Sequence, residues 1–362
     1  PPMNKPDRVR QALKSVLDPT TPLYIAPRFD PALAAWLWRF SANCTDRKLT
    51  ANMNVLGPLG HATLQLFAQL IAEEEIACDY QASGYYEVCR TEQGTAHACR
   101  DVALMRAHGF DAKVLTGEEI GARMMSLKNG VMGGAYFPDS ATCDPYRFVI
   151  EMAERVRRAG GRTEAGQVVT KVEGGAHPAV RLATGERFEA DAVVLATGAY
   201  SLQLARELGC RLPIQPGKGY HRDLEFGEGS RPPLEAACVL GETSVFCTPM
   251  SGRLRLAGTM EFSGLNHRMR PSRLAQLTAS AEQYLSGIGP SRVTSEWCGL
   301  RPCTPDGLPV VGRLPGQTKV FAATGHAMTG LTLGPVTGSL MADLVTGTTP
   351  SIEVTALAPA RF

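Results

Sequence analysis

Apolar and polar residues recur with different periods along this chain, and the periods predict where helices and strands lie. From Pro31 to Ile76 apolar residues return every three to four positions, which predicts mostly helix. Residues 79–90 have the composition of a strand, and a helix is expected from about Gln93 to His108. The preceding segment, residues 1–30, is interrupted by prolines and is expected to wrap over a surface.

Two helix starts are marked by capping residues. Thr116-Gly-Glu-Glu119 has the Thr-x-x-Glu spacing of a capping box, so a short helix should begin there. Asp144-Pro145 places an N-cap residue before a proline at the first helical position, which predicts a helix that continues to Ala159. Between them, Tyr136-Phe-Pro-Asp-Ser is typical of a strand end and turn.

The pattern changes to an α/β unit after Gly160-Gly161. Residues 162–172 are expected to form a strand, and 179–182 with 187–189 a short meander. The apolar run Asp191-Ala-Val-Val-Leu-Ala-Thr-Gly198 predicts a buried parallel strand that ends in glycine, where the backbone can approach a ligand.

The remaining segments alternate between antiparallel strands and helices. The predicted strands are residues 218–225, 245–249 paired with 253–260 across a Ser-Gly turn, 293–297 and 319–323. The predicted helices are 271–285 and 330–344. One domain is therefore expected to be discontinuous, with an antiparallel insertion, and the fold class to be mixed α/β and α+β.

Composition narrows the class of protein. The 362 residues allow two modest domains, and a formal net charge of +2 without a long basic run gives no reason to expect nucleic acid. The 10 cysteines show no metal-ligand spacing, so they are expected to be reduced packing residues, and no metal is expected. No uninterrupted apolar run approaches the ~20 residues that span a bilayer, and the chain starts at Pro1 rather than Met.

Candidate chemistry concentrates in residues 299–338. Arg301 lies in an apolar, turn-rich stretch, and a planar guanidinium binds a carboxylate through two parallel hydrogen bonds, so carboxylate binding is favoured over a solvated strand end. Asp306, in a Pro-Asp-Gly turn, is expected to stabilise the turn. Tyr220, in Gly217-Lys-Gly-Tyr-His, either reaches an anion or an amine with its hydroxyl or is a structural tyrosine.

A glycine-rich stretch opens the last predicted helix. One face of this helix has no side chains, because Gly330, Gly334 and Gly338 lie on it. Such a face allows either close packing of the helix on a strand or the binding of an electron-rich ring near the positive end of the helix. Thr197-Gly198-Ala199 and Thr324-Gly325-His326 end two predicted strands, which suggests adjacent strands that present backbone to one ligand. His326 is either a hydrogen-bonding wall residue or a general base. No Gly-x-Ser-x-Gly, His-Glu-x-x-His or P-loop motif occurs.

These motifs carry a family resemblance over essentially the whole chain. Gly-Leu-Arg-Pro-x-Thr-Pro-Asp-Gly-x-Pro-Val-Val-Gly, Thr-Gly-His-x-x-x-Gly-x-Thr and Val-Leu-Ala-Thr-Gly-Ala-Tyr-Ser resemble the FAD-dependent D-amino-acid oxidase superfamily, closest to its bacterial D-amino-acid dehydrogenases. The resemblance implies a discontinuous Rossmann-like FAD-binding domain (residues 145–215 and 300–362). It also implies an antiparallel-sheet substrate domain (residues 30–144 and 216–299).

The resemblance also implies residue roles. Arg301 would bind the substrate carboxylate with help from Tyr220, and Val169 would contact the adenine through its backbone. Thr197 and Gly198 would line the ADP half of FAD. Residues 325–332 would wrap the flavin, through Gly325, His326, Gly330, Leu331 and Thr332.

The implied reaction is oxidative deamination of a D-amino acid to a 2-oxo acid and ammonia. A hydride leaves the α-carbon of a substrate whose amine is neutral and passes to the flavin, so no dedicated base is needed. The electrons then pass to a quinone or another acceptor. The implied location is the cytoplasm, with or without peripheral contact to the cytoplasmic face of the inner membrane. The oligomeric state stays open.

Two departures from the family pattern keep alternatives open. Members that resemble glycine oxidase carry an arginine two residues after the His, where this chain has Met328, which favours the dehydrogenase branch. No strand–Gly-x-Gly-x-x-Gly–helix unit occurs, so an N-terminal truncation and weak FAD binding are expected. A dehydrogenase of D-hydroxyproline or other secondary amines, or a non-catalytic subunit without its nucleotide lobe, are the alternative functions.

Overall fold

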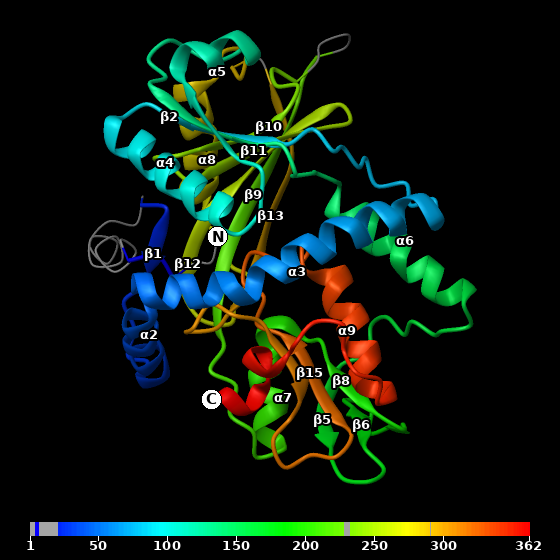
Figure 1. Ribbon diagram of the computed structural model, residues 1–362. Coiled ribbons are helices and arrows are strands. Elements are labelled where there is room, and N and C mark those ends of the chain that lie inside the picture. Colours follow the sequence, from blue (N-terminus) through cyan, green and yellow to red (C-terminus); the bar gives the residue numbers. More distant parts are fainter. Residues whose placement is uncertain (1–3, 7–20, 228–231, 290) are drawn as a thin grey trace.

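The computed structural model describes residues 4–6, 21–227, 232–289 and 291–362. Figure 1 shows a large sheet in the upper part of the molecule, two small sheets in the lower part, and the long helix α3 crossing between them. The expectation of a mixed α/β fold is confirmed. The expected surface wrapping of residues 1–30 falls largely outside the described residues, apart from 4–6 and 21–30.

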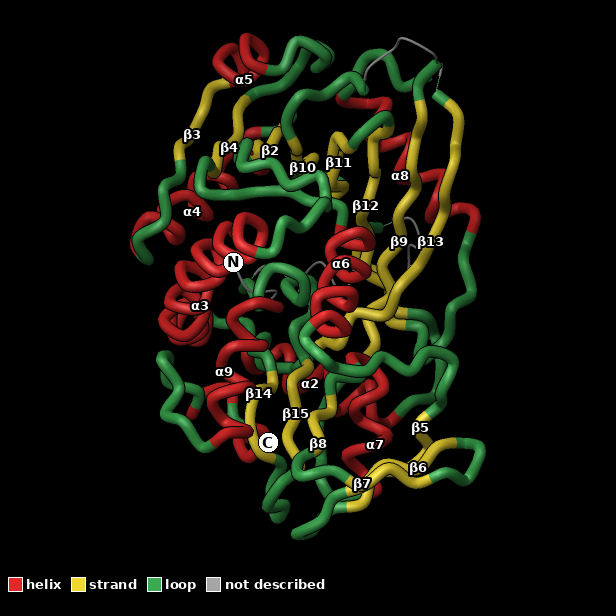
Figure 2. Tube along the Cα trace, turned by 90° about the vertical axis from the view of Figure 1, so that its right-hand side faces the viewer, coloured by secondary structure: helices red, strands yellow, loops and turns green. Residues whose placement is uncertain are grey.

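The large sheet is built from two distant stretches of the chain. Its strand order is β13-β9-β12-β11-β10-β2-β4-β3, and β1 pairs with β12 in parallel. The strands are β1 (Leu23–Ile25), β2 (Tyr85–Cys89), β3 (Lys113–Thr116), β4 (Gly133–Phe137), β9 (Gln215–Glu225), β10 (Ala237–Leu240), β11 (Val245–Met250), β12 (Arg253–Phe262) and β13 (Arg292–Cys303). The long strands β9, β12 and β13 run side by side, as Figure 2 shows.

Helices cover the two faces of this sheet unequally. Helix α8 (Pro271–Tyr284) packs Leu274 and Leu277 against Tyr220, Leu224 and Leu254 on one face. On the other face, α4 (Glu92–Ala107) buries Ala98 and Val102 against β2 and β4. The part of that face formed by β9 and β13 carries polar and exposed side chains.

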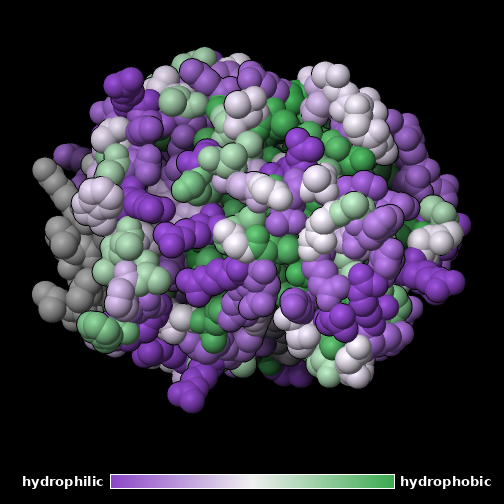
Figure 3. Space-filling view, turned by 90° about the horizontal axis from the view of Figure 1, so that it is seen from below, coloured by the Kyte–Doolittle hydropathy of each residue, from purple (hydrophilic) through white to green (hydrophobic). Residues whose placement is uncertain are grey.

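The lower part contains the strands of the predicted α/β unit. One sheet has the order β14-β15-β8 and the other β5-β6-β7. The elements are α6 (Pro145–Arg158), β5 (Val169–Glu173), β6 (Ala179–Leu182), β7 (Arg187–Glu189), β8 (Val193–Leu195), η1 (Gly198–Tyr200), α7 (Ser201–Glu207), β14 (Val310–Arg313), β15 (Val320–Thr324), α9 (Gly334–Thr346), η2 (Thr355–Leu357) and η3 (Pro359–Arg361). Seen from this end, hydrophilic residues cover most of the surface and hydrophobic residues show in the hollows between them (Figure 3).

Three helices complete the fold. They are α2 (Pro31–Asn43), α3 (Asp46–Glu73) and α5 (Gly117–Arg123). Contrary to the expectation from uninterrupted apolar runs, α3 is long and apolar enough to cross a membrane by length and composition, the one such helix among the described residues. Asn52 and Thr63 of α3 donate hydrogen bonds to the carbonyl oxygens of Asp306 (2.7 Å) and Thr332 (2.5 Å), so α3 is joined to the lower part of the fold.

The predicted helix starts agree well with the structure. The Thr116 capping box is present, and Asp144 accepts hydrogen bonds from the backbone N–H groups of Tyr146 and Arg147. The predicted helices from 93 and 271 match α4 and α8 within a residue or two. All 10 cysteines are free, and most are buried, as expected of packing residues.

Several predicted elements differ from the structure. The strand expected over 162–172 begins only at Val169. The strand around Val194 is parallel to β15 as expected but not fully buried: Val194 is 38% exposed, because β8 is the edge of its sheet. The last helix begins at Gly334 rather than Gly330, since Pro335 fixes the first helical turn.

Candidate active site

Arg301 lies inside β13, on the face of the sheet opposite α8. The strand continues through it because β13 pairs with β9 as far as Cys303, so the expected end at Trp297 is wrong. The guanidinium donates a hydrogen bond to the carbonyl oxygen of Thr259 (2.6 Å) and lies over Gly219, where a Cβ would collide with it. Within the described residues, no carboxylate forms an ion pair with Arg301. Burial lowers the pKa of this guanidinium, which favours an incoming anion as partner.

An irregular point in β12 supplies the Thr259 carbonyl. The register of β12 against β9 shifts between Gly258 and Glu261, and Thr259 has a φ of 63°. Such bulges redirect backbone groups, at a cost of about 1–3 kcal/mol for a non-glycine residue in the left-handed region. In a regular strand the Thr259 carbonyl would point to the neighbouring strand. The bulge turns this carbonyl so that it accepts a hydrogen bond from Arg301.

Tyr220 does not lie with Arg301. Arg301 pairs with Gly217 and Tyr220 with Cys298, an odd offset that puts the two side chains on opposite faces of the sheet. The Tyr220 hydroxyl donates to Oε2 of Glu261 (3.0 Å) on the α8 face. Burial and the Glu261 charge raise its pKa. The structure thus contradicts the expected help of Tyr220 in binding the same carboxylate.

A buried charged cluster surrounds Tyr220. Lys218 Nζ lies 3.4 Å from Oε1 of Glu261 and donates to Asn266 Oδ1 (2.5 Å), and Arg273 Nε lies 3.9 Å from the same carboxylate. Burial by itself would raise the pKa of Glu261, but hydrogen bonds from Ser263 and Tyr220 and the charges of Lys218 and Arg270 outweigh it, so that pKa is lowered. The cluster fastens β9 to β12 behind Arg301.

The two predicted strand ends meet, as expected. Strands β8 and β15 are parallel neighbours, so their carboxyl ends share one edge. A chain of hydroxyl groups joins these ends: Thr197 to Ser201 (2.9 Å), Ser201 to Thr324 (3.1 Å), and Thr324 to the carbonyl oxygen of Gly198 (3.0 Å). The structure therefore brings Thr197, Gly198 and Gly325 to one place.

An open groove with a volume of about 550 Å³ runs between β8 and α9. It is mostly apolar and is lined by Val194, Ala196, Ala323, His326, Gly330, Gly334, Thr337, Gly338, Met341, Ala342 and Val345. A Cβ on Gly334 or Gly338 would meet nothing within 4 Å. The glycine stripe thus faces open space, and the interpretation as close helix–strand packing is wrong for these two positions.

The loop between β15 and α9 connects the groove to Arg301. Cys303 and His326 form an isolated antiparallel bridge, and the Ala327 N–H donates to the carbonyl oxygen of Pro302 (3.0 Å). His326 Nε2 lies 2.9 Å from the Thr337 hydroxyl, and burial lowers the pKa of His326 to about 4. His326 is therefore neutral near pH 7, which suits a wall residue.

Other predicted residues lie apart from the groove. Val169 is in β5, paired with Leu182, and Leu331 packs its side chain against the cluster of Phe67 and Phe148. Thr332 is exposed, and its carbonyl oxygen accepts a hydrogen bond from the Thr63 hydroxyl. Met328 is 51% exposed. Asp306 stabilises its turn through the Leu308 N–H (3.2 Å), as expected, and also pairs with Arg361 (2.7 Å).

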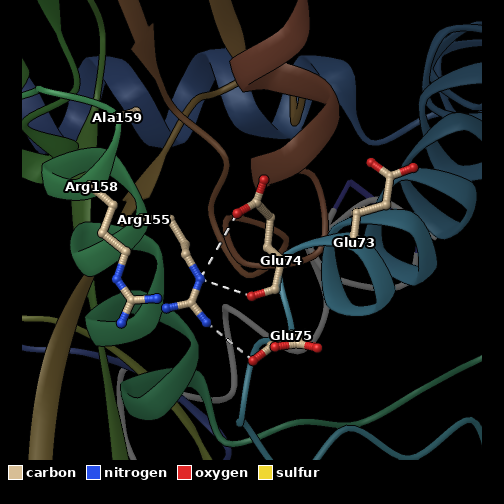
Figure 4. Close-up of a pocket in the computed structure, with 6 residues that line it drawn as sticks. All are labelled: Glu73, Glu74, Glu75, Arg155, Arg158 and Ala159. Atoms are coloured by element: carbon tan, nitrogen blue, oxygen red, sulfur yellow. Dashed lines mark hydrogen bonds and ion pairs between the residues drawn. The ribbon is translucent and has the colours of Figure 1, made fainter.

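A second hollow lies at the C-terminal end of α3, lined by Glu73, Glu74, Glu75, Arg155, Arg158 and Ala159 (Figure 4). Arg155 points from α6 to this end and donates hydrogen bonds to the carbonyl oxygens of Glu74 (2.8 Å) and Glu75 (3.1 Å). Such contacts satisfy the last carbonyls of a helix. The hollow is thus a helix-end junction, and Arg301 is not among the residues that line it.

Similarity to known proteins shows the family of this chain. A model of the family described as FAD dependent oxidoreductase matches residues 32–344. The chain belongs to this family. A D-amino acid dehydrogenase of Methylobacterium nodulans is 33% identical over 358 residues, which cover 97% of this chain and 84% of the relative. The D-amino acid dehydrogenase of Sinorhizobium medicae is 32% identical, with 97% and 85% covered.

Solved structures show the same fold. Glycine oxidase from Geobacillus kaustophilus superposes with a TM-score of 0.79 at 24% identity, covering 84% of this chain and 83% of that one. L-proline dehydrogenase from P. horikoshii gives a TM-score of 0.74 at 18% identity, with 84% and 82% covered. The fold is therefore shared with these solved oxidoreductases, and the family is that of the FAD-dependent oxidoreductases.

The residues present fit part of FAD. A bare glycine face and apolar walls suit a flat ring, and the open position at Gly198 allows a close approach of the cofactor to the backbone. No Gly-x-Gly-x-x-Gly occurs in the sequence, so no residue of this chain is assigned to the pyrophosphate.

Two residues beside Arg301, Thr259 and Gly219, were not predicted as site residues from the sequence. Thr259 carries no sequence signal, because its carbonyl is redirected by a bulge. Glycines at alternate positions 217 and 219 of one strand are a signal, since they leave a bare strip on one face of the sheet.

Proposed function

We propose that this family member is an FAD-dependent dehydrogenase that oxidises D-amino acids to 2-oxo acids and ammonia. The observation that carries the proposal is Arg301. It is a half-buried cation on an open sheet face, with a backbone acceptor and no carboxylate partner among the described residues. A buried guanidinium without a counterion favours a ligand that brings a carboxylate.

The chain's own residues position the substrate. Arg301 offers two parallel N–H groups to the carboxylate, and the Thr259 carbonyl fixes the remaining orientation of the guanidinium. Gly219 lets the guanidinium lie flat on the sheet. The Cys303–His326 bridge supports this arrangement, because it joins the strand of Arg301 to the loop that leads into the groove proposed for the flavin.

When bound, FAD would supply the two-electron acceptor for the hydride of the substrate α-carbon. Water would then hydrolyse the resulting imine to the 2-oxo acid and ammonia. His326 is a neutral imidazole near pH 7, because burial lowers the pKa of that side chain to about 4. We assign His326 as a neutral wall of the cofactor site, hydrogen-bonded to Thr337. A side chain with so low a pKa is a weak base at neutral pH, which favours a substrate that reacts as the neutral amine without a proton transfer to His326.

In the proposed cofactor site, the edge formed by Thr197, Gly198 and Gly325 receives the ADP half of FAD. Gly330 lines the wall of the flavin part of the groove. Val169, Leu331 and Thr332 contribute backbone contacts at most, because the Val169 and Leu331 side chains pack elsewhere and Thr332 is directed to solvent.

We also propose a quinone as electron acceptor and a place at the cytoplasmic face of the membrane that holds it. The support is the name of the sequence relatives, which are dehydrogenases. The test follows D-amino-acid oxidation without oxygen, with a soluble ubiquinone analogue as the only acceptor. Turnover that depends on oxygen and releases hydrogen peroxide would contradict a quinone acceptor.

The test of the function compares Arg301→Met and Arg301→Lys with the matched control Arg292→Lys on the same strand, whose guanidinium is an exposed partner of Glu225. Assays contain FAD in excess and an artificial dye acceptor. Arg301→Met should lower kcat/KM for D-amino acids by about 100-fold and Arg301→Lys by about tenfold, because lysine keeps the charge but not the paired contact. The control should stay within about twofold. Unchanged kcat/KM in Arg301→Met would remove the proposed role.

A further inference from the structure

A pair of glycines forms the floor of the open sheet face beside Arg301. Gly219 of β9 and Gly299 of β13 are direct register partners. A Cβ on Gly219 would collide with the Arg301 guanidinium, and a Cβ on Gly299 would collide with the indole ring of Trp297. The guanidinium and the indole therefore lie side by side over one glycine pair.

Packing into a hydrophobic core does not explain the position of the Trp297 side chain. It shares the face of Arg301, since the two residues are four positions apart in one strand. Trp297 is 56% exposed, although large aromatic side chains are usually well buried. Its ring contact among the described residues is His221, with centroids 5.4 Å apart and planes at 28°.

The apolar surface continues away from Trp297 across the sheet. Register neighbours on this face are Trp297, His221, Ala257 and Phe246. Phe246 is 49% exposed. At a strand spacing of about 4.8 Å the row extends about 14 Å from β13 to β11. Burial, with a smaller effect of the Arg255 charge, lowers the pKa of His221 to about 4, so the row is uncharged near neutral pH.

The cations next to this row already have partners. Arg255 makes two hydrogen bonds of 2.8 Å to Asp223, and Arg253 lies 2.5 Å from Asp144 and 3.1 Å from Asp223. An acidic substrate side chain would meet an apolar row and arginines that already form ion pairs. A second carboxylate is therefore disfavoured on this face.

From this geometry, and resting on the proposed function, we infer that Trp297 is a specificity-determining residue. With the substrate carboxylate on Arg301, the substrate side chain lies on the Trp297 ring and along the row towards Phe246. The enzyme thereby selects D-amino acids with aromatic or long apolar side chains over small and acidic ones.

Steady-state kinetics test the inference with D-phenylalanine and D-alanine, FAD in excess and a dye acceptor. Trp297→Ala should lower kcat/KM for D-phenylalanine about tenfold, mainly through KM, because ring stacking and apolar contact are lost. D-alanine should change less than about threefold, and Trp297→Phe should restore most of the preference. An equal change for both substrates, or none for D-phenylalanine, would overturn the assignment.

A second variant moves the ring without removing it. Gly299→Ala places a methyl group where the indole lies, so it should reduce the preference for D-phenylalanine as Trp297→Ala does. Unchanged preference in Gly299→Ala would show that the ring position over Gly299 has no role.

A binding measurement separates this inference from the proposed function. The probes are 3-phenylpropanoate and propanoate, which carry the carboxylate but cannot be oxidised at an amine, and the signal is tryptophan fluorescence. The chain has 3 tryptophans, so a change that disappears in Trp297→Phe reports this ring. If 3-phenylpropanoate binds more tightly than propanoate through Trp297 but neither amino acid is turned over, the proposed function is wrong. The role of Trp297 in binding the side chain is then still supported. If both amino acids are turned over and Trp297→Ala affects them equally, the proposed function is supported and the specificity role of Trp297 is wrong.

Discussion

Replacing Glu261 by glutamine tests the buried cluster behind the carboxylate site. Glu261 is fully buried, and Lys218 and Arg273 beside it are each 1% exposed. The carboxylate lies 3.4 Å from Lys218, 3.5 Å from Arg270 and 3.9 Å from Arg273. Glu261→Gln keeps the shape of the side chain but leaves two buried cations without a counter-charge.

The expected loss of unfolding free energy is large. With an effective dielectric constant of about 20, each pair at these distances attracts by roughly 4–5 kcal/mol, and the cost of burying the charges offsets much of the sum. Removing one partner of a buried ionic group typically costs about 3–5 kcal/mol, and we expect a value in that range. Arg270 contributes least, because its side chain is 47% exposed and its charge is screened.

Urea denaturation of the parent and of Glu261→Gln at pH 7 measures this loss. The matched control is Glu225→Gln on the same sheet, whose partner Arg292 is 77% exposed, and it should cost under about 1 kcal/mol. A loss in Glu261→Gln no larger than in the control would refute the claim that the cluster is held by Glu261.

The pH dependence follows from the lowered pKa of Glu261. Its pKa in the folded protein lies below the unfolded value of about 4.3, so the unfolded chain takes up the proton first as the pH falls. The stabilisation is therefore complete above about pH 4.3 and is lost as the pH drops through the folded pKa. The difference between parent and variant should be equal at pH 7 and pH 5 and should narrow only below about pH 4.

Two further predictions concern the groove and its histidine. Gly338→Ala should stabilise α9 by about 0.5–1 kcal/mol, because its Cβ meets nothing, yet lower the bound flavin measured by absorbance; Gly121→Ala in α5 is the control without a flavin effect. Equal flavin content in both variants would contradict the cofactor groove. The His326 pKa near 4 lies below the unfolded value of about 6.5, so the parent should lose stability between pH 7 and pH 5 and His326→Asn should lose less. An NMR titration that gives His326 a pKa near 6.5 would remove the basis of this prediction.

The sequence predicted what is set by near neighbours. The Thr116 capping box and the Asp144 N-cap depend on residues two or three positions away, and both are present. The meeting of the strand ends at Thr197 and Thr324 was predictable as well, because parallel neighbours end at one edge.

What the sequence did not predict depends on pairing between distant segments. The length of β13 is set by its register with β9, and the same register puts Tyr220 on the opposite face from Arg301. The free space over Gly334 and the exposure of Val194 depend on which elements flank the groove. A motif places residues near one another in sequence, whereas the pleat decides which side chains meet.

The backbone bridge between Cys303 and His326 has a consequence for turnover. It joins the strand that carries Arg301 to the loop that leads into the groove, so the distance from the carboxylate anchor to the ring position is set within two residues of backbone. A hinge motion between the upper and lower parts of the molecule would break these hydrogen bonds before it widened the site. In the proposed function, substrate entry and product exit along the open sheet face would leave this backbone connection intact, and an exit that needed the two parts to separate would not.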